Sequence, residues 1–61
     1  MMVYKLTVFK KNGEKLLDES FEARNDEEAK EQGQQLLQQH DYEEYTHRCT
    51  SPLGKLVLFH V

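Results

Sequence analysis

Apolar and polar residues alternate from position 3 to position 9, VYKLTVF, with the period of two that is typical of a half-buried β-strand. Asn12-Gly13 follows, a dipeptide that favours a two-residue hairpin loop because both residues tolerate positive φ. The pattern therefore predicts an antiparallel hairpin whose second strand covers residues 15 to 23. In the register set by this loop Lys11 faces Glu14, and one face gathers Tyr4, Leu6, Val8, Leu17 and Phe21.

Between residues 25 and 39 the apolar period becomes that of an amphipathic helix. Asn25 is a suitable N-cap, and Glu28 three residues later completes a variant of the capping box. Gly33 lies inside the apolar stripe, where it costs about 1 kcal/mol relative to Ala, so we expect the helix to approach the sheet closely there. The stripe consists of Ala29, Gly33, Leu36 and Leu37.

A second hairpin is predicted around Ser51-Pro52-Leu53-Gly54, because Pro suits the second position of a type I turn and Gly the left-handed fourth. It joins strands over residues 45 to 51 and 55 to 61. The last strand, KLVLFHV, is apolar on both sides, which favours a central position in the sheet, whereas the charged strands 15 to 23 and 45 to 51 are expected at the edges. A three-residue loop pairs Cys49 with Val57, His47 with Phe59, and Tyr45 with Val61.

These elements predict an α+β fold, a single ββαββ domain over residues 1–61. Placing the first and last strands at the centre gives a β-grasp-like four-stranded mixed sheet of order 2-1-4-3, with one helix on one face. In that arrangement the first and last strands run parallel. A two-plus-two split sheet of another topology is the alternative fold.

Composition narrows the class of protein. Eleven Asp and Glu against eight Lys and Arg give a net charge of −3, which disfavours a nucleic-acid binder. Cys49 is the only cysteine, which excludes an internal disulfide and is typical of a reducing compartment, so we expect a cytoplasmic protein. No apolar run has the length of a membrane span, and we expect no membrane association.

The predicted layout and longer segments of the sequence resemble two known families. The predicted layout is similar to the immunoglobulin-binding domains of streptococcal protein G, which also begin with a Tyr-Lys-Leu strand, here Tyr4-Lys5-Leu6. The acidic, Gln-rich helix face shows no matching side chains, so antibody binding is not carried over. The whole chain, especially YKLTVF, NGEKLLDESFEA and THRCTSPLGKLVLFH, resembles the small YhzD-like proteins of Bacillus relatives. That resemblance implies a bacterial cytoplasmic origin and supplies no catalytic residues.

His47 and Cys49 are two apart on one predicted strand and share a face, the spacing at which an imidazole and a thiol can hold a soft metal or act as base and nucleophile. A structural zinc site needs four ligands, and neither His40 nor His60, which points to the other side in the predicted register, converges on this pair. We therefore expect packing rather than a metal site, no cofactor and no catalysis. The carboxylates from Asp18 to Glu28 are expected to serve solubility and the helix start.

The sheet face away from the helix is the most informative functional clue. It is predicted to expose an apolar patch, which on a small domain often marks an interaction surface, so a homodimer or an unknown protein partner is the preferred hypothesis. Scattered single apolar residues without a role are the alternative. A single-stranded nucleic-acid-binding module, using Lys5, Phe9, Lys10, Lys11, Arg48 and Lys55, is a further alternative. The predicted interaction face comprises Val3, Phe9, Leu16, Leu56 and Leu58.

Overall fold

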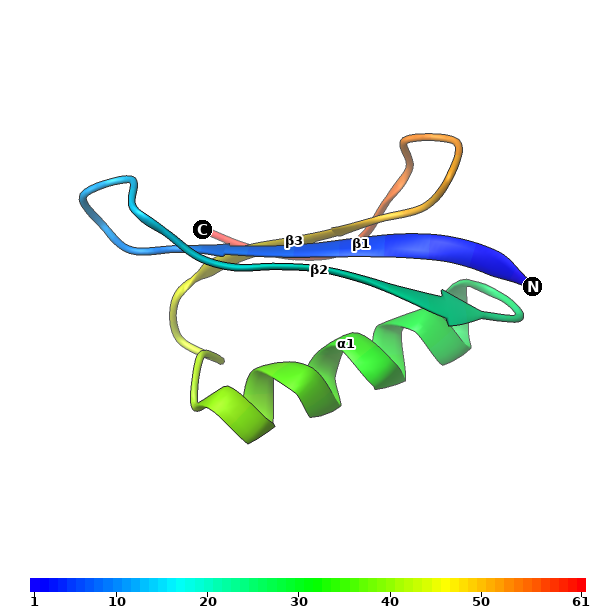
Figure 1. The fold of residues 1–61 in the computed structure, drawn as a ribbon, viewed down its shortest axis with the longest axis horizontal. Helices are drawn as coiled ribbons and strands as arrows, with labels where there is room; N and C mark the ends of the chain where they lie inside the picture. The colour runs from blue at the N-terminus through cyan, green and yellow to red at the C-terminus, as the bar shows by residue number, and fades with distance from the viewer.

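A computed structural model describes residues 1–61 and shows one sheet covered on one face by one helix (Figure 1). In chain order the elements are strand β1 (Met2–Phe9), strand β2 (Lys15–Ala23), helix α1 (Asp26–His40), strand β3 (Thr46–Thr50) and strand β4 (Leu56–His60). The predicted α+β class and the positions of the helix and both hairpins are confirmed. No helix of the structure is both long and apolar enough to cross a membrane.

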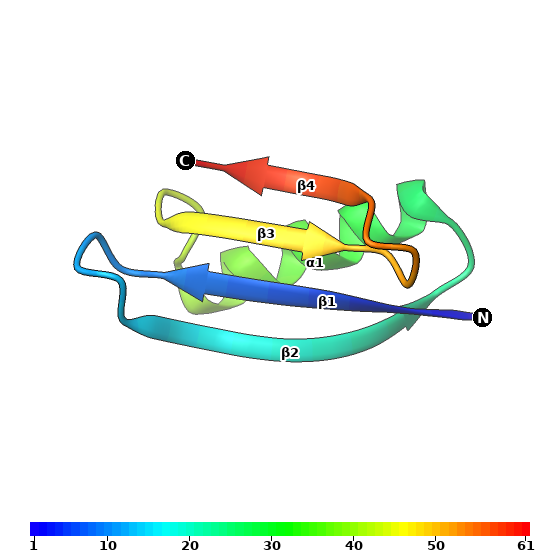
Figure 2. The same ribbon diagram turned by 90° about the horizontal axis from the view of Figure 1, so that it is seen from above.

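The four strands lie in the order β2-β1-β3-β4, and every neighbouring pair is antiparallel (Figure 2). The predicted order 2-1-4-3 is wrong, and the parallel pairing of first and last strands is wrong with it. Only residues 41 to 45 separate α1 from β3, and five residues span at most about 17 Å. This short link keeps the start of β3 near the end of α1, and β3 pairs with β1, which leaves β4 at the outer edge of the sheet.

The first hairpin has the predicted strand register but a different loop. Tyr4 lies opposite Phe21 and Val8 opposite Leu17, as expected. The loop has three residues, however, because the Gly13 N–H donates to the Lys10 carbonyl and the Lys10 N–H donates to the Glu14 carbonyl. Gly13 alone has a positive φ, 89°, and a bulge at Leu16 restores the register that a two-residue loop would produce.

The second hairpin has the predicted three-residue loop, with Gly54 at a φ of 84° and its N–H donating to the Ser51 carbonyl. Its strand register is wrong by one residue, because Val57 forms a bulge that the sequence pattern does not reveal. The observed pairs are Cys49 with Leu58, Arg48 with Phe59, and His47 with His60.

Helix α1 is capped at both ends. The Asn25 side chain accepts a hydrogen bond from the Glu28 N–H at 2.8 Å, which confirms the N-cap. The Glu28 carboxylate completes no reciprocal bond and pairs with Arg24 Nε at 3.2 Å instead. At the other end Asp41 adopts the left-handed conformation usually taken by Gly, and the Tyr42 N–H reaches the Leu37 carbonyl.

The core lies between α1 and the sheet, and Gly33 is the point of closest approach. A Cβ atom on Gly33 would lie 3.3 Å from Leu58 Cδ2 and 3.9 Å from Cys49 Sγ. The predicted close approach is therefore confirmed, with Leu58 as the bulky group opposite. The buried apolar residues are Tyr4, Leu6, Val8, Ala23, Ala29, Leu37 and Cys49.

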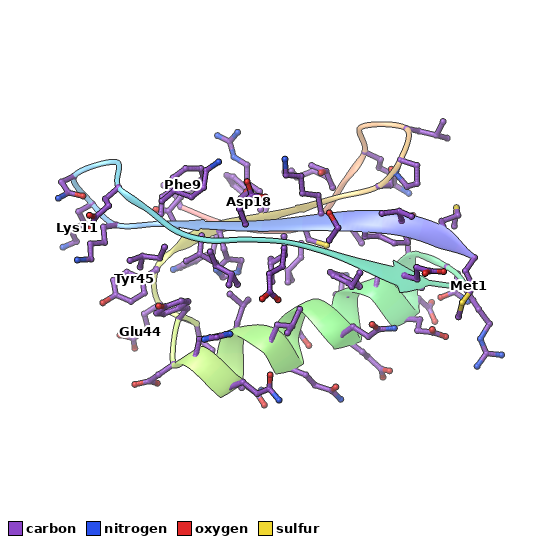
Figure 3. The ribbon with its side chains drawn as sticks, in the orientation of Figure 1. Met1, Phe9, Lys11, Asp18, Glu44 and Tyr45 are labelled. Atoms are coloured by element: carbon purple, nitrogen blue, oxygen red, sulfur yellow. The ribbon has the colours of Figure 1, made fainter.

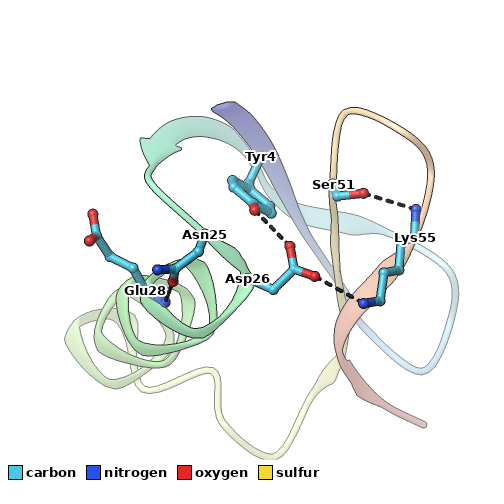
Figure 4. A network of polar contacts seen from close by, with 6 residues as sticks. All are labelled: Tyr4, Asn25, Asp26, Glu28, Ser51 and Lys55. Carbon is cyan, nitrogen blue, oxygen red and sulfur yellow. Dashed lines mark hydrogen bonds and ion pairs between the residues drawn. The ribbon is translucent and has the colours of Figure 1, made fainter. Parts of the chain in front are cut away.

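A polar network joins the start of α1 to β1 and to the turn that precedes β4 (Figure 4). The Tyr4 hydroxyl donates to Asp26 Oδ1 at 2.7 Å, and Lys55 Nζ donates to Asp26 Oδ2 at 3.0 Å. Burial and then the Asp26 hydrogen bond raise the pKa of Tyr4 to about 12, while the hydrogen bonds from Tyr4 and then Lys55 lower the pKa of Asp26. One carboxylate thus connects the helix to β1 and to the residue just before β4.

The contact at Gly33 predicts an energetic coupling with Leu58. Gly33→Ala should gain about 1 kcal/mol of helix propensity, but the new methyl group meets Leu58 Cδ2. In a Leu58→Val chain, which lacks that atom, Gly33→Ala should stabilise the protein by about 0.5–1 kcal/mol more than in the wild type. Urea unfolding of the four chains measures the difference.

Gln35→Ala, an exposed change on the same helix, is the control and should have the same effect in both backgrounds. Equal effects of Gly33→Ala in the two backgrounds would contradict the contact.

Candidate functional site

The sheet face away from α1, called the open face here, is built from alternate residues of each strand. Because directly opposed residues share a face, the pairings define rows across the sheet. Figure 3 shows Phe9 and Asp18 rising from this side. One row runs Ser20, Lys5, Thr50, Leu56, and the next runs Asp18, Thr7, Arg48, Phe59.

Three of the five predicted interaction residues lie on the open face. Val3 is 55% exposed, Leu56 is 46% exposed, and Phe9 is half-buried. Leu58 does not lie there, because the bulge at Val57 turns it towards Gly33. Leu16 does not contribute either: it is the bulged residue of β2 and packs against the core.

Phe59 is the open-face residue that sequence reasoning missed. It was expected opposite His47 on the core side, but it lies opposite Arg48 and is 50% exposed. The Val57 bulge moves it, and a bulge at this position has no signal in the sequence. With Leu56 in the adjacent row, Phe59 makes the β4 side of the open face apolar.

Charges on the open face are unevenly placed. Lys15 and Lys5 both pair with Asp18, at 3.0 and 3.5 Å, on the β2 side. The hydrogen bond from Lys15 lowers the pKa of Asp18, and the smaller opposing effect of burial does not reverse this shift. Arg48, which faces Phe59, takes part in no ion pair. The β2 side therefore carries an ion-paired cluster of Lys5, Lys15 and Asp18, and the β4 side is apolar with the unpaired Arg48 of β3 beside it.

His47 and Cys49 lie on the core side of β3, as expected, but the structure adds His60. His60 faces His47 with ring centroids 5.4 Å apart, so the prediction that it points to the other side is wrong. The His47 Nδ1–H donates to the Tyr45 carbonyl at 2.9 Å, since a carbonyl can only accept. No group of three or more His, Cys, Asp or Glu side chains is placed to hold a metal ion.

Burial determines the protonation states of His47 and Cys49. Burial lowers the pKa of His47, with the Tyr45 hydrogen bond opposing the shift and His60 adding to it. Burial and then the charge of Asp26 raise the pKa of the Cys49 thiol to about 11. At neutral pH the His47 imidazole is therefore neutral and the Cys49 thiol is protonated, which is the poorly nucleophilic form of cysteine.

The basic residues considered for nucleic-acid binding are mostly engaged within the chain. Lys10 pairs with Glu14 at 3.1 Å, and Lys55 with Asp26. Five of the eight Lys and Arg residues make such pairs. Beside the first turn lies an open hollow of about 1030 Å³, whose lining mixes Lys10 and Lys11 with Asp41, Glu43 and Glu44. This hollow carries both signs of charge.

The sequence matches one known protein family along its whole length. The family model for the YhzD-like protein matches residues 1–61. The chain belongs to the YhzD-like family. A relative from Bacillus subtilis (strain 168), the uncharacterized protein YhzD, is 45% identical over 60 residues, covering 98% of each chain. No solved structure matches the chain significantly. The family membership confirms the resemblance drawn from the sequence.

The Cys49 thiol should react slowly with thiol reagents while the protein is folded. Because the thiol is buried and its pKa is about 11, reaction with a disulfide reagent at pH 8 should be roughly a hundredfold slower than in denaturant. Leu53→Cys in a Cys49→Ala chain places a thiol at a fully exposed turn and should react rapidly. Comparable rates for the two folded chains would contradict the burial of Cys49.

His47 should make stability depend on pH. Its pKa is lowered in the folded chain, so the unfolded chain takes up the proton first as the pH falls below the ordinary value of 6.5. The stability contributed by the neutral ring is present above that pH and is lost as the pH falls through the folded pKa. The melting temperature should therefore decline between pH 7 and about 5.

His47→Gln, which cannot titrate, should flatten this decline, whereas His40→Gln at an exposed helix end should leave it intact. Asp18 and Asp26 act only at lower pH, since their pKa values lie below 3.8. An unchanged slope in His47→Gln would refute the assignment.

Proposed function

We propose that this YhzD-like protein is a non-catalytic module of the bacterial cytoplasm that associates with a second copy of itself through the β4 side of the open face. The observation that carries this proposal is the adjacency of Leu56 and Phe59, 46% and 50% exposed, in neighbouring rows of one face. Exposed neighbouring apolar side chains are typical of interaction surfaces, and aromatic residues commonly supply their binding energy.

The position of α1 supports the same proposal. The helix is the only element outside the sheet, and it packs on the opposite face (Figure 1). Nothing within the chain therefore covers Phe59 and Leu56. Arg48 lies beside Phe59 without an ion pair, and Arg next to an aromatic ring is a frequent combination at the centre of interfaces.

The alternatives have less support. A single-stranded nucleic-acid binder needs free cations around its aromatic residues, but Lys5, Lys10 and Lys55 are engaged with carboxylates and the net charge is −3. A thiol or metal function at His47 and Cys49 would need an ionisable thiol, and burial disfavours one.

Light scattering after size exclusion, over a range of concentrations, tests the proposal. The wild type should approach twice the chain mass of 7.2 kDa as concentration rises. Phe59→Asp should weaken association by about tenfold or more, because it places a charge in the apolar centre of the interface. Circular dichroism confirms that the variant folds.

Leu53→Asp is the matched control, because Leu53 is 94% exposed at the tip of the second turn and lies outside the rows of the open face. It should associate like the wild type. A wild type that stays at 7.2 kDa at every concentration would overturn the proposal.

A further inference from the structure

The two outer edges of the sheet differ in charge. The β2 edge carries Lys15, Asp18, Glu19 and Glu22, charges of the kind that prevent an edge from pairing with another strand. The β4 edge, Leu56–His60, carries no Asp, Glu, Lys or Arg. An outer strand also has backbone N–H and C=O groups without partners in its own sheet. The occupant that satisfies these groups is another β-strand.

The geometry of β4 limits where such a strand can pair. The bulge at Val57 interrupts regular pairing at the start of the strand. Beyond it, Leu58, Phe59 and His60 continue in regular register with β3. Regular pairing on the outer edge is therefore available over this segment, whose central residue is Phe59.

We infer that β4 pairs antiparallel with β4 of a second copy, about a two-fold axis at Phe59, so that two four-stranded sheets form one continuous sheet. This inference rests on the proposed self-association and specifies its geometry. An antiparallel pair of identical strands is compatible with two-fold symmetry, because each strand meets the same surface on its partner. Since the segment has no formal charge, the pairing opposes no like charges.

On the open face this symmetry brings the two Phe59 rings side by side at the axis. Arg48 faces Phe59 within each chain, so the joined row reads Arg48, Phe59, Phe59, Arg48 across the two copies. On the helix side Leu58 would face His60 of the second copy. There a shallow hollow of about 380 Å³, lined by Leu58, His60, Gln34 and Gln38 among others, lies between α1 and β4.

Disulfide trapping tests the axis directly. Residues opposite one another in an antiparallel pair have Cα atoms roughly 4.5–5.5 Å apart, within the range that a disulfide spans. Phe59→Cys should therefore oxidise to a covalent dimer at least about tenfold faster than Leu53→Cys, because pairing raises the local thiol concentration. Cys49, buried in both chains, takes no part.

Paired charges supply a second readout. Phe59→Lys and Phe59→Glu should each be monomeric alone, because like charges meet at the axis, whereas an equimolar mixture should form a mixed dimer. Native mass spectrometry distinguishes the mixed dimer by its mass. Both variants should remain folded, since position 59 is half exposed.

The outcomes separate the two proposals. A wild type that dimerises, together with a Phe59→Cys chain that oxidises no faster than Leu53→Cys and a charge mixture that stays monomeric, would overturn the strand pairing and leave self-association standing. A wild type that never exceeds 7.2 kDa would overturn both. Rapid trapping with rescue by the mixture would establish the axis at Phe59.

Discussion

The close approach of α1 to β3 and β4 at Gly33 is the constraint on which the rest of this small fold depends. A Cβ atom at position 33 would already lie 3.3 Å from Leu58 Cδ2, so a larger side chain there would hold the helix away from β4, and a 61-residue chain has little other apolar surface with which to compensate. The missing side chain lets one helix seal the core. Leu58 fills the space above Gly33 although β4 is the outermost strand.

The polar contacts complement this packing at the helix start. Asp26 receives hydrogen bonds from Tyr4 on β1 and from Lys55 beside β4, two segments that are not neighbours in the sheet. The carboxylate also lies at the positive end of the helix dipole. Packing at Gly33 therefore sets the distance between helix and sheet, and Asp26 sets the position of the helix along the strands.

The helix could be predicted from the sequence because its signals are local: the Asn25 cap and the stripe through Ala29, Gly33 and Leu37 all act within a few residues. The strand order could not be predicted in this way. Apolar side chains on both sides of β4 indicate a central strand, but the pattern of one strand does not show which strands lie beside it. The structure places those side chains at an edge instead. Only part of the open face could be predicted from the sequence. Simple alternation correctly places Val3, Phe9 and Leu56, whereas the positions of Leu16, Leu58 and Phe59 depend on two bulges.

Those bulges have a consequence for the shape of the sheet. Each lies in an outer strand, Leu16 in β2 next to the first turn and Val57 in β4 next to the second, and the two turns lie at opposite ends of the sheet (Figure 2). A bulge increases the local right-handed twist of its strand. Extra twist at two diagonal corners works against the flat stacking of a sheet on its copies that fibril formation requires.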